Sequence, residues 1–383
     1  MNPTYDIAVI GAGPAGASTS YFLAQAGLNT LLIDKASFPR DKTCGDAVGP
    51  RSLGVITEMN LLDDLAAVGH RATHMSLASP NGKTFTDPIP QLPHDVPNYS
   101  IVIPRYQLDN ILQQRAIAGG AHFRQGQVLS LDTNDDHVTL NLKKDVITAR
   151  MAVIATGASF KLLQQTGILT HIPQVGVAAR AYYDNVIGLQ DKLEFFFQGI
   201  PLPGYGWIFP TSPTSANIGA GVFPSRQKQP SPRTVMENFL QLPVLQQMLA
   251  NATPTTPIKG YPLRVDFATA PTYGRHILLV GEAAGLVNPI SGEGIDYALE
   301  SGQIAAHHLA QMFASDNFSP AQYRAYDRQL RDRFQKVFRF CQFISLAAMN
   351  KPFLNWLTGP GPLRDYLRSR IFRIALGDIR LRA

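Results

Sequence analysis

The sequence predicts an α/β fold, in which a Rossmann-like domain is interrupted by an antiparallel β-sheet domain and followed by a helical C-terminal region. Three observations lead to this prediction. A strand, a glycine-rich turn and a helix open the chain, short strands separated by turn residues fill its middle, and a second buried strand with a glycine-rich turn and a long helix returns near residue 276. We therefore expect a discontinuous Rossmann-like domain (1–73, 99–160 and 270–314), a sheet domain (74–98 and 161–269) and a helical region (315–383).

The opening segment has the pattern of a dinucleotide-binding turn. Residues 7–10 form an apolar run typical of a strand buried on both faces. Gly11, Gly13 and Gly16 follow at G-x-G-x-x-G spacing. In this pattern the first glycine permits a tight turn, the second admits a pyrophosphate close to the backbone, and the third lets helix and strand pack closely.

The helix start and the next strand complete the pattern. The helix begins around Pro14 and Ala15, where unpaired N–H groups and the helix dipole attract phosphate. Residues 28–33 form the second strand, and Asp34 and Lys35 follow it. We expect the Asp34 carboxylate to accept hydrogen bonds from the ribose hydroxyls of an adenosine.

The rest of the chain supplies short elements of both types. Residues 74–87 read as a hairpin that turns at Asn81-Gly82, because Asn-Gly suits a two-residue turn. We expect helices at residues 105–118, 234–250 and 295–314, and strands at residues 99–103, 127–131, 137–142, 145–149, 151–155, 175–185, 192–198, 205–210, 216–223, 259–264 and 276–280.

Composition restricts the cellular setting. Hydrophobic residues make up 45% of the 383 residues and charged residues 16%, which is enough apolar material for a large core. The two cysteines, Cys44 and Cys341, cannot build a disulfide framework, so we expect a reducing, cytoplasmic compartment. We expect no secretory signal, because the first strand starts after four residues, and no membrane-spanning helix, because no apolar run reaches about 18 residues.

Positive charge is concentrated at the C-terminal end. Residues 321–383 hold 13 Lys/Arg and 4 Asp/Glu, a balance of +9, whereas the rest of the chain has a balance of −3. Nucleic acid is not an expected partner, because no recognised binding motif accompanies the charge. Three interpretations remain open: an ordinary solvated basic face, a helical cap over a cavity, or a strip around Arg364, Arg368, Ile371 and Phe372 that contacts an anionic membrane surface peripherally.

Three glycine-containing motifs are similar to those of a known flavoprotein group. GAGPAG with Asp34, ATG at residues 155–157, and GEAAGLVNPISGEGI at residues 281–295 resemble the three FAD fingerprints of the p-hydroxybenzoate-hydroxylase-like flavoproteins. Within that group, RDKTCGDAVGP at residues 40–50 and PGYGWIFP at residues 203–210 resemble the geranylgeranyl reductase family. The resemblance implies an FAD enzyme that reduces carbon–carbon double bonds in polyprenyl chains.

The resemblance also implies roles for individual residues. Arg105 would contact the FAD pyrophosphate, Val128 would offer backbone groups to the adenine, and Glu282 would reach the ribitol, although the family usually has Asp there. The amides around Gly292, Gly294 and Ile295 would face the flavin N1/O2 edge. Further cofactor contacts are implied for Arg40, Cys44, Gly45, Thr156, Gly157 and Gly281.

Cys44 and Asp46 are the nearest proton-carrying candidates for catalysis. Arg40 and Lys42 would favour a Cys44 thiolate, whereas the neighbouring aspartates would oppose it. The alternative is that Cys44 is a small buried hydrophobic residue. Cys341 we expect to pack in the core.

Tyr205, Trp207 and Phe209 alternate along one predicted strand, so their side chains share a face. Such a face would line a hydrophobic tunnel for isoprene units, and ordinary sheet core is the alternative.

The sequence therefore favours an FAD-dependent reductase of polyprenyl chains. A monooxygenase of aromatic or polyketide substrates and a non-catalytic flavin- or lipid-binding protein remain alternatives. We find no second dinucleotide fingerprint, so NADPH would bind transiently or a protein reductant would replace it, and the nine histidines show no metal-ligand spacing, so no metal is expected.

Overall fold

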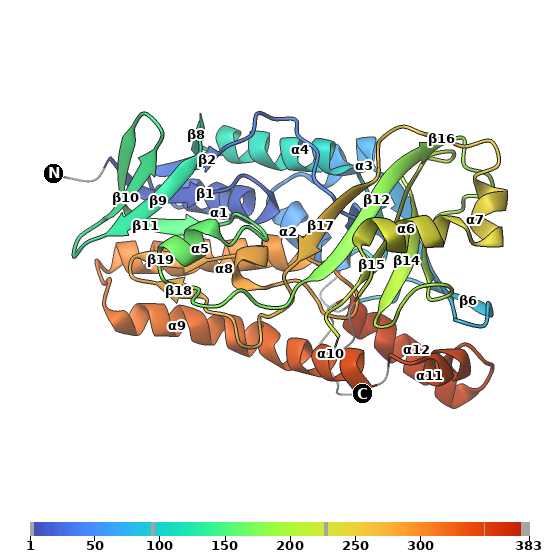
Figure 1. Cartoon of the computed structure of the whole chain (residues 1–383). Helices are drawn as coiled ribbons and strands as arrows, with labels where there is room; N and C mark the ends of the chain where they lie inside the picture. The colour runs from blue at the N-terminus through green and yellow to red at the C-terminus, as the bar shows by residue number, and fades with distance from the viewer. Residues whose placement is uncertain (1–3, 93–95, 226–228, 348, 377–383) are drawn as a thin grey trace.

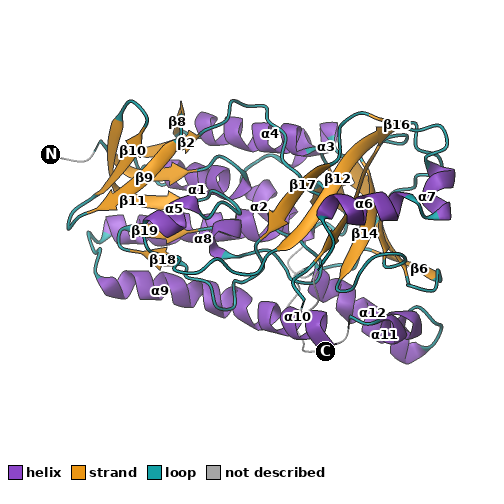
Figure 2. Ribbon diagram, in the orientation of Figure 1, coloured by secondary structure: helices purple, strands orange, loops and turns teal. Residues whose placement is uncertain are grey.

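The computed structural model describes residues 4–92, 96–225, 229–347 and 349–376. Two large sheets lie next to each other along the molecule, and helices flank both of them (Figure 1, Figure 2). The last residues of the predicted helical region, 377–383, lie outside the described residues. The α/β fold with a second sheet and a helical C-terminal region is confirmed.

The first sheet contains the glycine-rich turn. Its strands run in the order β18-β19-β11-β1-β2-β8, with β10 paired to β11 and β9 to β10. The five strands from β19 to β8 pair in parallel, as expected of a Rossmann-like sheet. The strands are β1 (Tyr5–Ile10), β2 (Thr30–Asp34), β8 (His122–Gln125), β9 (Val128–Thr133), β10 (Val138–Leu142), β11 (Val146–Ile154), β18 (Tyr273–Gly274) and β19 (Ile277–Leu279).

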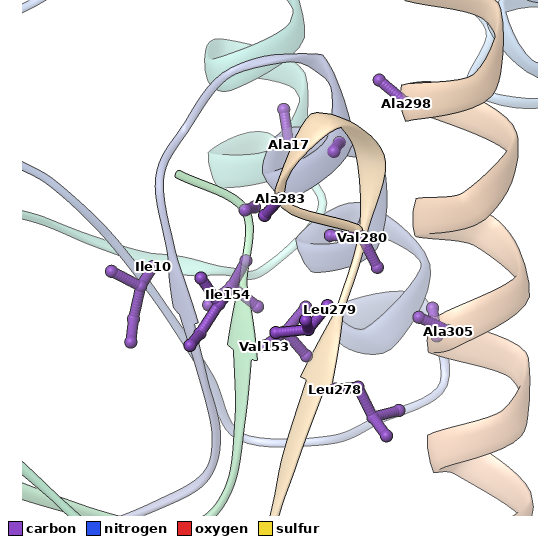
Figure 3. Close-up of a cluster of buried hydrophobic side chains, with 14 of the residues drawn as sticks. Ile10, Ala17, Val153, Ile154, Leu278, Leu279, Val280, Ala283, Ala298 and Ala305 are labelled. Carbon is purple, nitrogen blue, oxygen red and sulfur yellow. The ribbon is translucent and has the colours of Figure 1, made fainter. Parts of the chain in front are cut away.

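Helices from both ends of the chain pack on this sheet. The 3₁₀ turn η1 (Gly281–Ala284) leads from β19 toward α8, and the associated helices are α1 (Pro14–Gln25), α2 (Pro50–Glu58), α3 (Leu62–Val68), α4 (Arg105–Ala118), α5 (Lys161–Gln165), α8 (Ile295–Ala314) and α9 (Pro320–Leu330). Gly302 lets α8 approach α1, because a Cβ there would lie 2.6 Å from the Ala15 carbonyl oxygen. Figure 3 shows the resulting core, in which Ile10, Val153, Leu279 and Ala305 come from β1, β11, β19 and α8.

The second sheet has the order β16-β12-β15-β14-β13-β5-β6, with β17 paired to β12. The helix α6 covers one face closely, because a Cβ on Gly206 would lie 2.5 Å from the Phe239 ring. The elements are β5 (His74–Ala78), β6 (Thr84–Pro88), β12 (Gly176–Asp184), β13 (Lys192–Phe196), β14 (Gly204–Pro210), β15 (Ala216–Val222), β16 (Thr253–Pro254), β17 (Lys259–Leu263), α6 (Pro232–Leu240) and α7 (Pro243–Met248).

A small third sheet and the C-terminal helices complete the structure. The sheet has the order β3-β7-β4, and α12 packs on the second sheet, where Phe372 stacks on Phe85 with ring centroids 5.5 Å apart. The elements are β3 (Ala47–Val48), β4 (His70–Ala72), β7 (Ser100–Val102), the π-helical turn η2 (Arg331–Gln335), α10 (Lys336–Ala347), α11 (Lys351–Leu357) and α12 (Pro362–Ala375).

Several details differ from the sequence prediction, beyond short elements such as β3, β4, β16 and β18 that were not expected. The strands expected at residues 145–149 and 151–155 are one strand, β11, because no turn residue separates them. The helix expected at residues 234–250 is two helices, because Pro243 begins a new one. The strand β8 was not predicted. The second sheet is not wholly antiparallel, since β13 pairs in parallel with β5.

Candidate active site

A single cavity of about 680 Å³ is lined by residues from both large sheets and from α12. Its volume falls within the range of about 300–1,000 Å³ common for small-molecule and cofactor sites. Among the described residues, no cluster of three or more His, Cys, Asp or Glu side chains is arranged to hold a metal ion.

The glycine turn forms one end of the cavity. Gly11 has φ +106°, and a Cβ there would lie 2.4 Å from the Ala155 carbonyl oxygen, so the turn requires glycine. Gly13 lines the cavity in an ordinary extended conformation, with space for a Cβ that would approach the Arg40 guanidinium only to 3.5 Å. Space kept open at Gly13 is what close approach of a pyrophosphate requires.

Two arginines meet one buried carboxylate beside this turn. Asp109 is fully buried, and its oxygens pair with Arg105 Nε at 2.6 Å and Arg105 Nη2 at 2.8 Å, and with Arg40 Nη1 at 2.9 Å. Two guanidinium groups against one carboxylate leave one net positive charge at the cavity, which suits a phosphate group.

The two carboxylates predicted to bind the ribose and the ribitol also line the cavity, and each already accepts hydrogen bonds from backbone N–H groups. The Asp34 carboxylate accepts hydrogen bonds from Ala12 N and Ala36 N, both at 2.8 Å. Glu282 Oε1 accepts from Arg264 N at 3.1 Å, so the longer Glu side chain is directed to that backbone group. Carboxylate oxygens accept more than one hydrogen bond, so both remain able to bind hydroxyls.

The loop before α8 differs from expectation in its hydrogen bonds. Glu293 Oε1 accepts from Ile295 N at 3.0 Å and from Asp296 N at 3.3 Å, so these N–H groups already have an acceptor. Burial raises the pKa of Glu293 to about 8, and the neighbouring Asp296 acts in the same direction. The predicted contact between the Ile295 amide and a flavin would therefore require the Glu293 carboxyl to turn away.

Cys44 lies in the cavity wall, on a loop that packs closely against β14, the strand that carries Tyr205, Trp207 and Phe209. A Cβ on Gly45 would lie 3.0 Å from the Phe209 ring, so this position favours glycine. Burial raises the pKa of the Cys44 thiol, and Asp46 adds to this, against the opposing effect of Arg105 and Lys42. The protonated thiol is therefore favoured over the thiolate.

The apolar end of the cavity is formed by the alternating aromatics. Tyr205, Trp207 and Phe209 line it together, as their alternation predicts, and Phe195 packs on Tyr205 at 5.4 Å between ring centroids. Burial raises the pKa of Tyr205 well above its ordinary value, and its hydroxyl donates to the Ser291 carbonyl. These side chains form the wall of a cavity and not only sheet core.

The helix α12 closes the same end. Ile371, Phe372 and Leu376 line the cavity, and Arg368 is buried, with its guanidinium donating to the Leu357 and Gly359 carbonyls at 3.0 and 2.9 Å. Arg368, Ile371 and Phe372 therefore do not form the predicted strip on a membrane-facing surface. The alternative of a helical cap over the cavity agrees with their positions.

The cavity gathers nearly all of the predicted site residues, with two exceptions. Gly16 and Gly281 do not line it: a Cβ on Gly16 would lie 1.7 Å from the Gly11 carbonyl oxygen, and one on Gly281 would lie 2.9 Å from the Ala15 Cβ. Both therefore serve packing around the turn. The members are Gly11, Gly13, Pro14, Ala15, Asp34, Lys35, Arg40, Cys44, Gly45, Asp46, Arg105, Val128, Thr156, Gly157, Tyr205, Trp207, Phe209, Glu282, Gly292, Gly294 and Ile295.

Sequence reasoning missed residues that support the site from outside. Tyr182 and Asn217 both donate to Asp46, and Arg180 fixes the same loop by donating to Asp41 and to the Lys42 carbonyl. Asn217 is the polar residue of the otherwise apolar β15, which is a pattern that sequence analysis can detect. The others carry no comparable pattern.

Comparisons with known proteins agree with this geometry. The family model described as "FAD binding domain" matches residues 4–341. Menaquinone reductase of Mycobacterium tuberculosis is 32% identical over 384 residues, which is 95% of this chain and 89% of that protein. Digeranylgeranylglycerophospholipid reductase of Methanococcus aeolicus is 28% identical over 346 residues, 88% of this chain and 84% of that protein.

Solved structures show the same fold. A geranylgeranyl bacteriochlorophyll reductase-like protein of Thermoplasma acidophilum superposes with a TM-score of 0.79 at 22% identity, over 92% of this chain and 90% of that chain. A flavin-dependent brominase superposes with a TM-score of 0.76 at 20% identity, over 97% and 93%. The chain therefore belongs to the FAD binding domain family and is an FAD-dependent oxidoreductase of the p-hydroxybenzoate-hydroxylase-like group.

Proposed function

We propose that this oxidoreductase reduces carbon–carbon double bonds in the polyprenyl chain of a lipid. The observation that carries the proposal is the continuity of one cavity from the glycine turn at Gly13 to the aromatic wall at Trp207 and Phe372. A polyprenyl chain requires an apolar slot, and the reaction requires one alkene to lie against the cofactor. Menaquinone and digeranylgeranylglycerophospholipid, which occur in the names of two relatives, both carry polyprenyl chains.

The residues at one end of the cavity would bind the cofactor, and those at the other end would bind the substrate. Gly13, Arg40 and Arg105 would hold the pyrophosphate, and the aromatic wall would orient the alkene and exclude water. Bound FAD, once reduced by NADPH or a protein reductant, supplies a hydride. Cys44 or Asp46 would give the proton to the other alkene carbon.

Anaerobic reoxidation of the flavin tests this function. We expect a geranylgeranyl compound to reoxidise the chemically reduced enzyme in the absence of oxygen. The absorbance of the flavin measures this reoxidation. Oxygen-dependent reoxidation coupled to an aromatic substrate would instead indicate a monooxygenase, and no response to either would indicate a binding protein. With Cys44→Ser we expect an unchanged flavin spectrum, and the rate of reoxidation distinguishes the two proton donors: a slower rate would indicate Cys44, and an unchanged rate would indicate Asp46 and assign Cys44 to packing.

The C-terminal helices carry exposed apolar side chains that could bring the protein to a lipid substrate at a membrane surface. We propose that the C-terminal helices contact an anionic lipid surface, since Phe343, Leu363 and Tyr366 are 65%, 62% and 55% exposed in a segment with a charge balance of +9. None of the helices in the described ranges combines the length and apolar character needed to cross a bilayer.

Vesicle co-sedimentation tests this contact. We expect binding to vesicles rich in anionic lipid, and at least roughly tenfold weaker partitioning for Leu363→Ser with Tyr366→Ser, because each large apolar side chain contributes about 1.5–3 kcal/mol when buried. Ile172→Ser removes a side chain that is 60% exposed elsewhere and serves as the control. Equal loss in the control, or none in the double variant, would contradict the proposal.

A further inference from the structure

Asp46 has two carboxyl oxygens in different surroundings. The residue is fully buried in the cavity wall, in the left-handed backbone region at φ +69°, and its carbonyl accepts from Ile103 N at 3.0 Å. Oδ2 accepts from the Tyr182 hydroxyl at 2.5 Å and from Asn217 Nδ2 at 2.7 Å. Oδ1 is buried and has no hydrogen-bond partner within the described parts of the chain.

The asymmetry indicates where a proton would be held. Leaving an ionised carboxylate oxygen buried without a donor is unfavourable, whereas a protonated carboxyl group turns that oxygen into an O–H donor. Because Oδ2 already receives two donors, the proton of a neutral Asp46 belongs on Oδ1. When that proton leaves, the two donors on Oδ2 stabilise the resulting negative charge.

Asn217 holds this carboxyl relative to the aromatic wall. Its side chain is fully buried and lies outside the cavity lining. The amide nitrogen also donates to the Cys44 carbonyl at 2.7 Å, and the amide oxygen accepts from Trp207 Nε1 at 2.9 Å. One side chain thus joins the loop of Cys44 and Asp46 to the strand that faces the substrate region.

Tyr182 supplies the second donor from outside. Its ring lies 4.3 Å from the Arg180 guanidinium carbon, and burial raises the pKa of its hydroxyl, so that it remains a donor throughout the working pH range. The next residue, Tyr183, lies on the opposite face of β12 and packs in the hydrophobic core beneath α6.

Burial and the groups around Asp46 shift its pKa in opposite directions. Burial raises the pKa of Asp46 to about 7, while the hydrogen bonds from Tyr182 and Asn217 and the charges of Arg180 and Arg105 oppose the rise. On the same loop, the charge of an ionised Asp46 raises the pKa of the Cys44 thiol. The carboxyl group is therefore able to exchange a proton near neutral pH.

We propose that Tyr182 and Asn217 are positioning residues that hold Asp46 with its proton on Oδ1, and that Asp46 is the acid of the reduction. This inference rests on the proposed function. The bound flavin would supply a hydride to one alkene carbon, the π electron pair would form a C–H bond at the other carbon with the Oδ1 proton of Asp46, and the O–H electron pair would stay on the Asp46 carboxylate. Water then reprotonates Asp46.

Infrared spectroscopy of the oxidised FAD-bound protein tests the positioning without substrate. We expect a protonated-carboxyl band that titrates near neutral pH and disappears in Asp46→Asn. In Tyr182→Phe we expect the midpoint to rise by roughly one to two pH units, because one donor to the carboxylate is lost. Tyr183→Phe removes a hydroxyl one residue away and should leave the midpoint unchanged.

The pH profile of anaerobic reoxidation tests the catalytic part. We expect Asp46→Asn to slow alkene-dependent reoxidation strongly, and Tyr182→Phe to displace the profile upward with its infrared midpoint. A band that survives in Asp46→Asn, or a midpoint unmoved in Tyr182→Phe, would overturn the inference. If the infrared results hold but no alkene reoxidises wild-type enzyme, the proposed function is wrong and the assigned acid role falls with it, while the positioning of Asp46 is supported.

Discussion

Gly13→Ala is expected to yield a folded protein that binds FAD about 10–100-fold more weakly. The added Cβ comes no closer than 3.5 Å to the Arg40 guanidinium and 4.0 Å to the Arg105 guanidinium and Asp109 Oδ2, and the backbone at Gly13 is in a conformation open to any residue. The same Cβ would enter the space left for the pyrophosphate, and overpacking typically costs about 1–3 kcal/mol, which is about one to two powers of ten in affinity. Fluorescence titration of the apoprotein with FAD measures the change.

Two other glycines provide the controls. Gly54→Ala, in α2, adds a Cβ that meets Val96 at 4.0 Å and should leave FAD binding unchanged. Gly16→Ala should fail to fold, because its Cβ would lie 1.7 Å from the Gly11 carbonyl oxygen. Wild-type affinity in Gly13→Ala would contradict the placement of the pyrophosphate.

Asp109→Asn is expected to lower the free energy of unfolding of the apoprotein by about 3–5 kcal/mol, the usual effect of breaking a buried ion pair from one side. The change removes the carboxylate shared by Arg40 and Arg105. Bound FAD would supply a pyrophosphate to the same arginines. We therefore expect FAD to stabilise the variant by more than it stabilises the wild type, in denaturant unfolding with and without FAD.

The exposed pair of Arg124 and Asp145 provides the comparison. Its side chains are 41% and 47% exposed, so Asp145→Asn should change the free energy of unfolding far less than Asp109→Asn does and leave the effect of FAD unaltered. An FAD effect in Asp109→Asn that equals or falls below the wild-type effect would show that the two arginines do not bind the pyrophosphate.

Local sequence patterns were sufficient for most of the first sheet and its helices. The helices at residues 105–118 and 295–314 begin and end where periodicity places them, because each starts after a proline or glycine and buries one continuous face. The strand β8 escaped detection because His122–Gln125 is short, alternates weakly and has no fully buried residue. Its pairing with β2 depends on the sheet and not on its own sequence. The residue boundaries of the two domains stay a prediction.

The candidate site was predictable where a motif fixes the backbone. Glycine spacing located the turn at Gly11 and Gly13, and alternation placed Trp207 on the cavity side. Asn217 stands out as a polar residue in an apolar strand, but its pairing and that of Tyr182 with Asp46 were not predictable, because the two residues lie 171 and 136 residues away in sequence. Only the packing of β12 and β15 against the loop brings them together. The same is true of α12, whose approach to the cavity no local pattern specifies.

The position of α12 has a consequence for the order in which the cavity is completed. Residues 371–376 complete the wall of a chamber whose floor is made by residues 11–46, so the two halves of that chamber are synthesised far apart in time. A nascent chain whose residues 371–376 are still inside the ribosome would contain the glycine turn without the apolar side chains that close the other end of the cavity. The apolar end of the chamber is therefore completed last during synthesis, whereas the glycine turn at its other end is made of residues that are synthesised first.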